Sequence, residues 1–178
     1  MVIYKGFVTL RKNGREEIVQ TTNAVAFLIV DPIRKVVLLI SQCREAMVRR
    51  GNPSGTIVEV PAGRRDLKCG IKALVAKEAH EEVGKRIKAK QVKLLNRGIP
   101  LASSPGVLTE RIWLAYVETD LRSCIKDSSK TYGLVAHGER IRRRVVSFDE
   151  LERMTFEDMK TYALTQWFLN DQRRKKER

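Results

Sequence analysis

Cysteine is scarce in this chain of 178 residues, and its three copies are not spaced for a structural role. Cys43, Cys69 and Cys124 lack the close spacing typical of metal ligands, and their odd number argues against a disulfide framework. Long apolar runs are also absent, so no stretch predicts a membrane span, and the N-terminus has no signal-peptide pattern. We therefore expect a reducing, cytoplasmic setting and no membrane partner.

Acidic residues are outnumbered, and aromatic residues make up only 6% of the chain. The formal net charge of +14 favours anionic partners such as nucleotides, sugar nucleotides or RNA, although a basic proteome or a thermophile's charged surface explains it equally well. Basic residues cluster at 140–144 and at 173–178. Neither cluster is interleaved with aromatic residues, so a base-stacking RNA surface is not favoured.

The length and an apolar content of 43% predict one domain with a proper core. We expect three parts. Residues 1–22 form a small N-terminal β segment, residues 23–172 form the main domain, and residues 173–178 form a basic tail that is a frayed helix end or disordered.

A predicted helix over residues 71–83 has one apolar and one acidic face. Its apolar stripe consists of Ile71, Leu74, Val75, Ala79 and Val83, and Gly84 follows where an αL cap would end it. Glu78, Glu81 and Glu82 are three and four residues apart and can reach one patch of space. Oxygen ligands on one face suit Mg²⁺ or Mn²⁺. The alternative is a solvated acidic face.

With the loop before this helix, residues 63–85 resemble the Nudix hydrolase signature, G-x5-E-x7-R-E-U-x-E-E-x-G-U, where U is a bulky aliphatic residue. The matching positions are Gly63, Glu78, Glu81, Glu82 and Gly84. Three positions depart from it: Cys69 replaces the first Glu, Lys77 the Arg, and Lys85 the last aliphatic residue. A Cys–Lys pair cannot make a bidentate carboxylate–guanidinium contact, so we expect a looser or differently braced loop beside an intact acidic cluster.

The resemblance implies an α/β fold, a Nudix-type α/β/α sandwich with a mixed sheet. We expect strands at 24–30, 36–40, 57–63, 91–97, 111–117 and 144–146, two N-terminal strands within 2–20, loops at 45–56 and 120–129, and helices after 147 and over about 156–170. Capping-box spacing at Ser147–Glu150 and at Thr155–Asp158 marks the starts of the last two helices.

Three further segments resemble the ADP-ribose pyrophosphatase branch of this superfamily. Ser104, Pro105, Gly106 and Glu110 match an S-P-G-x-x-x-E segment, which in physical terms is a rigid turn followed by an acid at a strand start. Gln42 and Arg44 match an R-Q-x-R segment in which Ser41 replaces the first Arg. Arg44 is then a candidate substrate contact, with a surface salt bridge as the alternative.

Residues 59–63 resemble the E-x-P-A-G entry to the box, which implies that the backbone carbonyl of Ala62 joins the metal shell. Glu59 either braces an arginine of the substrate site or points outward. Residues 133–141 resemble a loop of the same branch that brings an acid to the substrate. Glu139 is the candidate general base there, and His137 is the alternative proton acceptor.

Together these resemblances imply a Mg²⁺-dependent hydrolase, with Mn²⁺ as the alternative ion, that cleaves the pyrophosphate of a nucleoside diphosphate linked to another moiety. ADP-ribose, giving AMP and ribose 5-phosphate, is the first expectation. The expected metal ligands are Ala62, Glu78, Glu81 and Glu82, the catalytic residues Glu81, Glu82 and Glu139, and the substrate-binding residues Arg44, Ser104, Pro105, Gly106 and Glu110. The alternatives are a nucleotide-sugar or capped-RNA hydrolase, or a silent nucleotide- or RNA-binding Nudix module. The N-terminal segment implies a homodimer.

Overall fold

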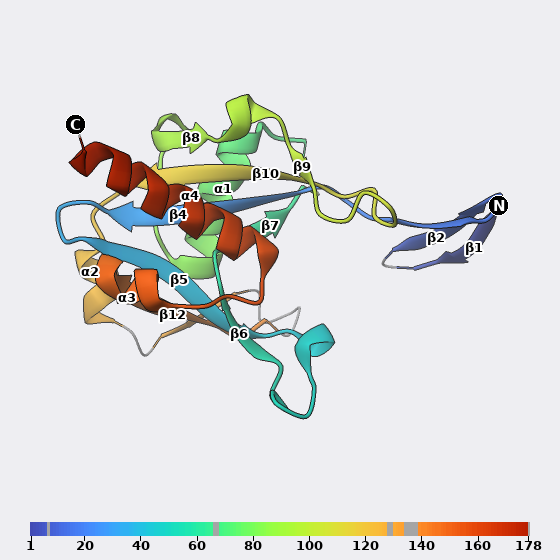
Figure 1. The fold of residues 1–178 in the computed structure, drawn as a ribbon, viewed down its shortest axis with the longest axis horizontal. Coiled ribbons are helices and arrows are strands. Elements are labelled where there is room, and N and C mark those ends of the chain that lie inside the picture. The colour runs from blue at the N-terminus through green and yellow to red at the C-terminus, as the bar shows by residue number, and fades with distance from the viewer. Residues whose placement is uncertain (7, 66–67, 128–129, 134–138, 178) are drawn as a thin grey trace.

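The computed structural model describes all residues except 7, 66–67, 128–129, 134–138 and 178. Its described part is built on a mixed β-sheet with helices on both faces (Figure 1). The strands are β1 (Val2–Lys5), β2 (Thr9–Asn13), β3 (Glu16–Gln20), β4 (Ala24–Asp31), β5 (Val36–Cys43), β6 (Thr56–Glu59), β7 (Ala62–Arg64), β8 (Val92–Leu94), β9 (Leu101–Ala102), β10 (Arg111–Glu118), β11 (Thr131–Tyr132) and β12 (Ile141–Ser147). The helices are η1 (Glu45–Met47), α1 (Ile71–Val83), η2 (Ala89–Gln91), η3 (Asn96–Gly98), α2 (Arg122–Lys126), α3 (Phe148–Arg153) and α4 (Met159–Lys176).

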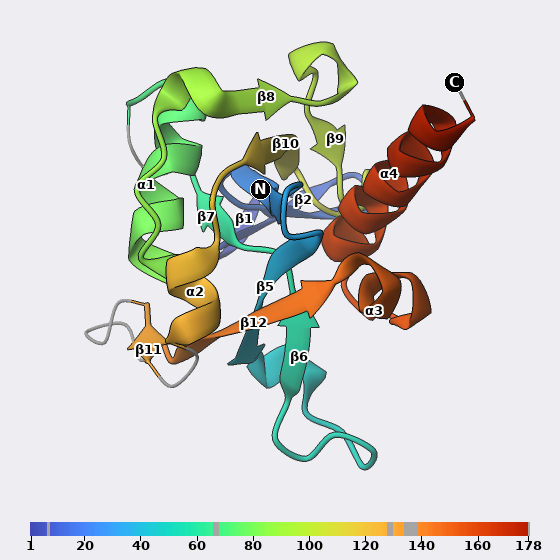
Figure 2. The same cartoon turned by 90° about the vertical axis from the view of Figure 1, so that its left-hand side faces the viewer.

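The main sheet has the strand order β11-β12-β5-β4-β10-β8, with β6 on β5, β7 on β4 and β9 on β10. The pair β4–β10 is parallel and the other pairs of this sheet are antiparallel. Helix α1 covers one face, and α3 and α4 cover the other (Figure 2). The predicted α/β/α sandwich with a mixed sheet is confirmed.

Strand β4 is apolar without alternation because both of its faces are buried. Val25, Phe27 and Ile29 pack on the α1 side, while Leu28 and Val30 pack on the α4 side. All five side chains are fully buried. At about 1.5–3 kcal/mol for each large apolar side chain, this strand provides a substantial part of the hydrophobic stabilisation.

The N-terminal segment forms a separate three-stranded antiparallel sheet, β1-β2-β3, that extends away from the main body (Figure 1). Its outer strand exposes Val2, Ile3 and Tyr4 by about half of each side chain. We predict two strands here, and the structure has three. The first predicted strand is divided into β1 and β2, and between them the N–H of Gly6 donates to the carbonyl of Val8 at 2.9 Å.

Several other element predictions need correction, including the strand expected at 57–63, which is divided into β6 and β7. Residues 120–129 are not all loop, because α2 buries Cys124 beside the buried Leu121. The segment 45–56 contains the short helix η1, and the strand expected at 91–97 is limited to β8. Helix α4 begins later than expected, since Asp158, rather than Thr155, caps it by accepting the N–H of Thr161. It continues to Lys176, so of the two alternatives for the basic tail, a helix end is the one observed for residues 173–176.

Candidate active site

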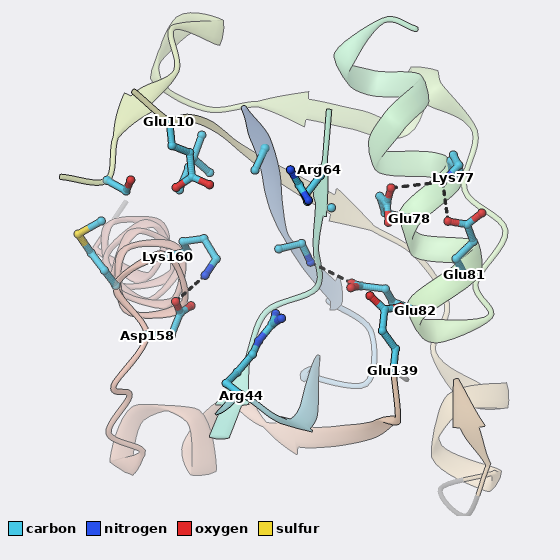
Figure 3. Close-up of a pocket in the computed structure, with 16 residues that line it drawn as sticks. Arg44, Arg64, Lys77, Glu78, Glu81, Glu82, Glu110, Glu139, Asp158 and Lys160 are labelled. Atoms are coloured by element: carbon cyan, nitrogen blue, oxygen red, sulfur yellow. Dashed lines mark hydrogen bonds and ion pairs between the residues drawn. The ribbon is translucent and has the colours of Figure 1, made fainter. Parts of the chain in front are cut away.

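A pocket of about 690 Å³ lies at the edge of the sheet between α1 and the first turn of α4 (Figure 3). This volume is in the range of roughly 300–1,000 Å³ usual for small-molecule sites. The pocket is lined by Ala24, Arg44, Ala62, Gly63, Arg64, Lys77, Glu78, Glu81, Glu82, Ser103, Glu110, Ile112, Glu139, Asp158, Met159 and Lys160. The structure therefore brings together segments separated by more than 130 residues in sequence.

One wall is the acidic face of α1, as predicted. Glu78 and Glu82 are buried, and Glu81 is more exposed. Glu82 accepts a hydrogen bond from the N–H of Ala62 at 2.9 Å. Burial raises the pKa of Glu82 well above its usual range, and the nearby negative charge of Glu78 adds to this rise, although the Ala62 hydrogen bond opposes it. In the ionised state, these two buried carboxylates on one helix face would be stabilised by a nearby cation.

Gly63 allows Glu78 to lie directly against β7. A Cβ atom at position 63 would come within 2.1 Å of Glu78 Cδ, closer than non-bonded atoms can approach. The absent side chain is therefore what gives the Glu78 carboxyl group its place beside the strand. The spacing of Gly63 and Glu78 in the motif therefore corresponds to a direct contact between the two residues.

Lys77 is paired with the acids of its own helix. Its Nζ lies 2.6 Å from Glu81 Oε2 and 3.5 Å from Glu78 Oε1, and the hydrogen bond to Glu81 raises the pKa of Lys77. Cys69 packs against the apolar core on the α1 side. In the loop before α1, the Arg65 guanidinium lies over the Trp113 ring at 5.3 Å. The expectation of a looser or differently braced loop stays a prediction.

Arg44 lies on the opposite wall of the pocket, where it is bound to a buried acid. Glu59 is 1% exposed and accepts hydrogen bonds from Arg44 Nε at 2.7 Å and from Gln42 Nε2 at 2.8 Å. Burial lowers the pKa of Arg44, but the contact with Glu59 raises it overall. Of the two alternatives for Glu59, the bracing of an arginine is the one observed. The Arg44 guanidinium points into the pocket (Figure 3).

The first turn of α4 supplies a wall that the sequence analysis missed. Lys160 Nζ lies 2.5 Å from Asp158 Oδ1 and 3.8 Å from Glu59 Oε2. Met159 completes this side, and Arg64 and Ser103 are two further lining residues not predicted. The Asp-x-x-Thr spacing at 158–161 marks the helix start, but no sequence pattern relates it to residues 100 positions earlier.

The S-P-G segment forms a turn beside the N-terminal strands. The carbonyl of Ser104 accepts hydrogen bonds from the N–H groups of Val107 and Leu108, and the Val19 N–H donates to the Val107 carbonyl. Ser104, Pro105 and Gly106 are exposed and stand outside the lining of the described pocket. Glu110, by contrast, lines the pocket opposite α1 (Figure 3). Contact of the turn itself with substrate stays a prediction.

Glu139 lines the pocket, entering from the segment that leads into β12. His137 lies outside the described residues. Glu139 thus shares one cavity with the α1 acids, which come from a different part of the chain. This placement is compatible with a proton-accepting role, which stays a prediction.

The pocket is acidic although the chain is strongly basic. Its lining contains six acidic and four basic side chains, whereas the chain has a formal charge of +14. Among the described residues, no three His, Cys, Asp or Glu side chains already converge at ligand distance. Carboxylate oxygens are the kind of donor that Mg²⁺ prefers, and Glu78, Glu81 and Glu82 line one wall of this pocket. Binding of a divalent metal ion at this wall stays a prediction.

No protein-family model matches the chain. Two curated relatives do: the chain is 35% identical over 115 residues to a GDP-mannose pyrophosphatase of Cronobacter sakazakii, a stretch that covers 62% of this chain and 57% of the relative. It is 33% identical over 113 residues to a GDP-mannose pyrophosphatase of an Enterobacter species, covering 61% of this chain and 56% of the relative. The matched stretch thus spans little more than half the length of these relatives.

The names of these relatives can be compared with the resemblance found in the sequence. A pyrophosphatase is the kind of enzyme that the Nudix resemblance implies, and the α/β/α sandwich agrees with it independently. The printed names of both relatives agree with the Nudix resemblance of residues 63–85. In the described residues, no helix is long and apolar enough to cross a membrane.

Proposed function

We propose that the chain is a Mg²⁺-dependent Nudix hydrolase that cleaves the diphosphate bond of a nucleoside diphosphate sugar. The observation that supports this most is the single pocket in which the α1 acids, Arg44, Glu110 and Glu139 all meet. Motifs recognised separately in the sequence therefore contribute to one cavity. The relatives named as GDP-mannose pyrophosphatases favour a nucleotide sugar over other diphosphates.

The proposed roles follow from position and charge. Glu78, Glu81, Glu82 and the Ala62 carbonyl would hold Mg²⁺, which when bound neutralises phosphate oxygens and lowers the pKa of water. Arg44, held by Glu59, meets remaining phosphate charge from the other wall. Glu139 accepts the proton of the attacking water, and Glu110 orients the substrate.

Two nucleotide sugars, ADP-ribose and GDP-mannose, are each supported as the substrate by a different observation. The S-P-G-x-x-x-E resemblance favours ADP-ribose, which would give AMP and ribose 5-phosphate. The relatives favour GDP-mannose, which would give GMP and mannose 1-phosphate. Both substrates place one diphosphate between a nucleoside and a sugar, so one site chemistry serves either.

The substrate is tested by incubating the protein with Mg²⁺ and each of GDP-mannose, ADP-ribose, a dinucleoside polyphosphate and a capped RNA. Products are separated by chromatography and assigned by ³¹P NMR. The expected result is a nucleoside monophosphate and a sugar phosphate from at least one nucleotide sugar, with the highest kcat/KM for that class. Preferential release of the cap from RNA would contradict the proposed substrate class.

A homodimer through the N-terminal sheet is proposed on separate grounds. The resemblance to ADP-ribose pyrophosphatases implies it, and the sheet β1-β2-β3 leaves Val2, Ile3 and Tyr4 half exposed. Analytical ultracentrifugation of the wild type beside a Val2→Lys, Tyr4→Lys double variant tests it. The expected result is a dimer that the double variant converts to a monomer, and a monomeric wild type would contradict it.

A further inference from the structure

The end of α1 and the hairpin that leads to Glu139 are joined by a set of contacts that the proposed chemistry does not itself use. The hairpin consists of β11 and β12, and Glu139 lies just before β12. The end of α1 contains Glu81 and Glu82, two of the proposed metal ligands. Whatever fixes these two segments to each other also fixes the proposed base relative to the proposed metal site.

Arg143 makes the first of these contacts. Alternation along β12 directs Arg143 to the α1 side, as it does Ile141 and Val145, whereas Val146 packs on the α4 side. Its Nε donates to the carbonyl of Val83 at 2.8 Å. The last four carbonyls of a helix lack partners within the helix and form the negative end of its dipole. A guanidinium is well suited to this position because it provides both a donor and a positive charge.

Tyr132 holds the same guanidinium from the other side. Arg143 Cζ lies 4.1 Å from the centroid of the Tyr132 ring, within the distance for a cation–π contact. Gly84 makes room for this pair: its φ of 59° is left-handed, and a Cβ there would come 2.6 Å from Tyr132 Cε1 and 2.7 Å from Arg143 Nη2. Gly84, which ends α1, is thus also the residue whose missing side chain leaves space for Tyr132 and Arg143.

Gly133 connects this contact to Glu139. Its N–H donates to the carbonyl of Glu81 at 3.3 Å, which satisfies a second carbonyl at the end of α1. A Cβ on Gly133 would lie 2.8 Å from Glu139 Cβ, so the backbone of residue 133 directly supports the base of the Glu139 side chain. A continuous series of contacts therefore runs from α1 through residues 132, 133 and 143 to Glu139.

We infer that Arg143, clamped between Tyr132 and the end of α1, is a positioning residue that sets the place of Glu139 relative to Glu81 and Glu82. The inference rests on the proposed function and on Glu139 as the proton acceptor. Arg143 does not line the described pocket, so it acts only through the hairpin. Because a shift of about 1 Å can reduce turnover about a hundredfold, a small displacement of Glu139 is sufficient for a large effect.

The test is Arg143→Met, with Arg143→Lys as the conservative variant and Arg142→Met as the matched control. Arg142 is the preceding arginine of the same strand and is exposed, so its replacement removes the same charge without touching the clamp. For the nucleotide sugar that is turned over, we expect Arg143→Met to lower kcat by about ten- to a hundredfold. KM and the Mn²⁺ dissociation constant should remain within about twofold, because no proposed ligand is removed, and Arg143→Lys should recover part of kcat.

A double-variant cycle separates positioning from general destabilisation. In a Glu139→Gln background, Arg143→Met should cause no further fall in kcat, because the group that it positions is already lost. Losses that multiply in the double variant would overturn the inference. A lower Tm with unchanged kcat in the single variant would overturn it equally.

Amide hydrogen exchange gives a readout that does not depend on turnover. Arg143→Met should accelerate exchange at Gly133 and Glu139, whereas Arg142→Met should not. Exchange unchanged in Arg143→Met would overturn the clamp even if the enzyme is active. Accelerated exchange in a protein that hydrolyses no nucleotide sugar would support the clamp and contradict the proposed function, so the two failures are distinguishable.

Discussion

At the scale of single residues, the lack of space beside Gly63 explains most directly why the motif has a glycine at this position. Replacement of Gly63 by Ala should displace the Glu78 carboxyl group, because the new Cβ would come within 2.1 Å of Glu78 Cδ. Since a flexible side chain can move aside, we expect little change in Tm but an affinity for Mn²⁺ reduced about tenfold or more. Titration calorimetry measures the affinity.

The matched control for this variant is Gly70→Ala. Gly70 precedes α1 and has φ −66°, and apart from its two chain neighbours no described residue has an atom within 4 Å of the Cβ that the substitution would add. Mn²⁺ affinity should therefore remain at the wild-type value. Equal losses in both glycine variants would show that the contact between Gly63 and Glu78 is not what matters.

Asp31 illustrates the other use of a buried acid, which is to stabilise the fold. It is 1% exposed and accepts hydrogen bonds from the N–H groups of Ile33, Arg34 and Leu121. Burial alone would raise the pKa of Asp31, but the hydrogen bonds from Leu121 and Arg34, together with the Arg34 charge, lower it overall. Replacement by Ala should lower the free energy of unfolding by about 2–3 kcal/mol at pH 7.

The same carboxyl group predicts a pH dependence. Because the pKa of Asp31 is lower in the folded state, its ionised form stabilises the protein above the unfolded value of about 3.9. That contribution is lost as pH falls through the folded pKa. Urea unfolding from pH 6 to pH 3 should therefore show the wild type converging on Asp31→Asn at the acid end. A difference that stays constant over this range would contradict the assignment.

At the scale of elements, one hydroxyl group connects the strand before the motif to α4. Thr161 is fully buried, and its Oγ1 accepts from the N–H of Val60 at 2.8 Å and donates to Asp158 Oδ2 at 2.6 Å. Thr161→Val keeps the shape but leaves the Val60 N–H without its partner. We expect a loss of about 1–3 kcal/mol in the free energy of unfolding, measured by chemical denaturation.

Thr161→Ser is the control, because it keeps the hydroxyl group and removes only a methyl group. Its loss should be clearly smaller than that of Thr161→Val. If serine destabilises the protein as much as valine does, packing of the methyl group, and not the hydrogen bond, connects α4 to the strand.

Elements with local patterns were predictable, and elements set by tertiary contacts were not. The apolar stripe and the following Gly84 predict where α1 begins and ends, and the structure confirms the helix as Ile71–Val83. The start of α4 is not predicted correctly because both Thr155 and Asp158 have the spacing of a helix cap. Only Asp158 accepts the hydrogen bond of a cap, from the N–H of Thr161. Lys160 was missed as a pocket residue because its neighbour Glu59 is distant in sequence.

At the scale of the whole molecule, the excess positive charge is separate from the acidic pocket. A chain of +14 whose pocket lining has more acids than bases should bind a small diphosphate through few phosphate contacts. We expect the logarithm of KM for a nucleotide sugar to change with the logarithm of salt concentration with a slope below about 2. A much steeper slope would indicate an extended nucleic-acid surface and favour the RNA alternative.

We propose that the acids of α1 make this fold a divalent-metal hydrolase of nucleotide sugars. The most direct measurement is the Mg²⁺-dependent rate of nucleoside monophosphate release from GDP-mannose and ADP-ribose, for the wild type and for Glu82→Gln. We expect a rate that saturates with Mg²⁺ in the wild type and falls by about a thousandfold or more in Glu82→Gln. Turnover unaffected by Glu82→Gln, or nucleotide binding without any turnover, would contradict it, and the latter would identify a silent binding module.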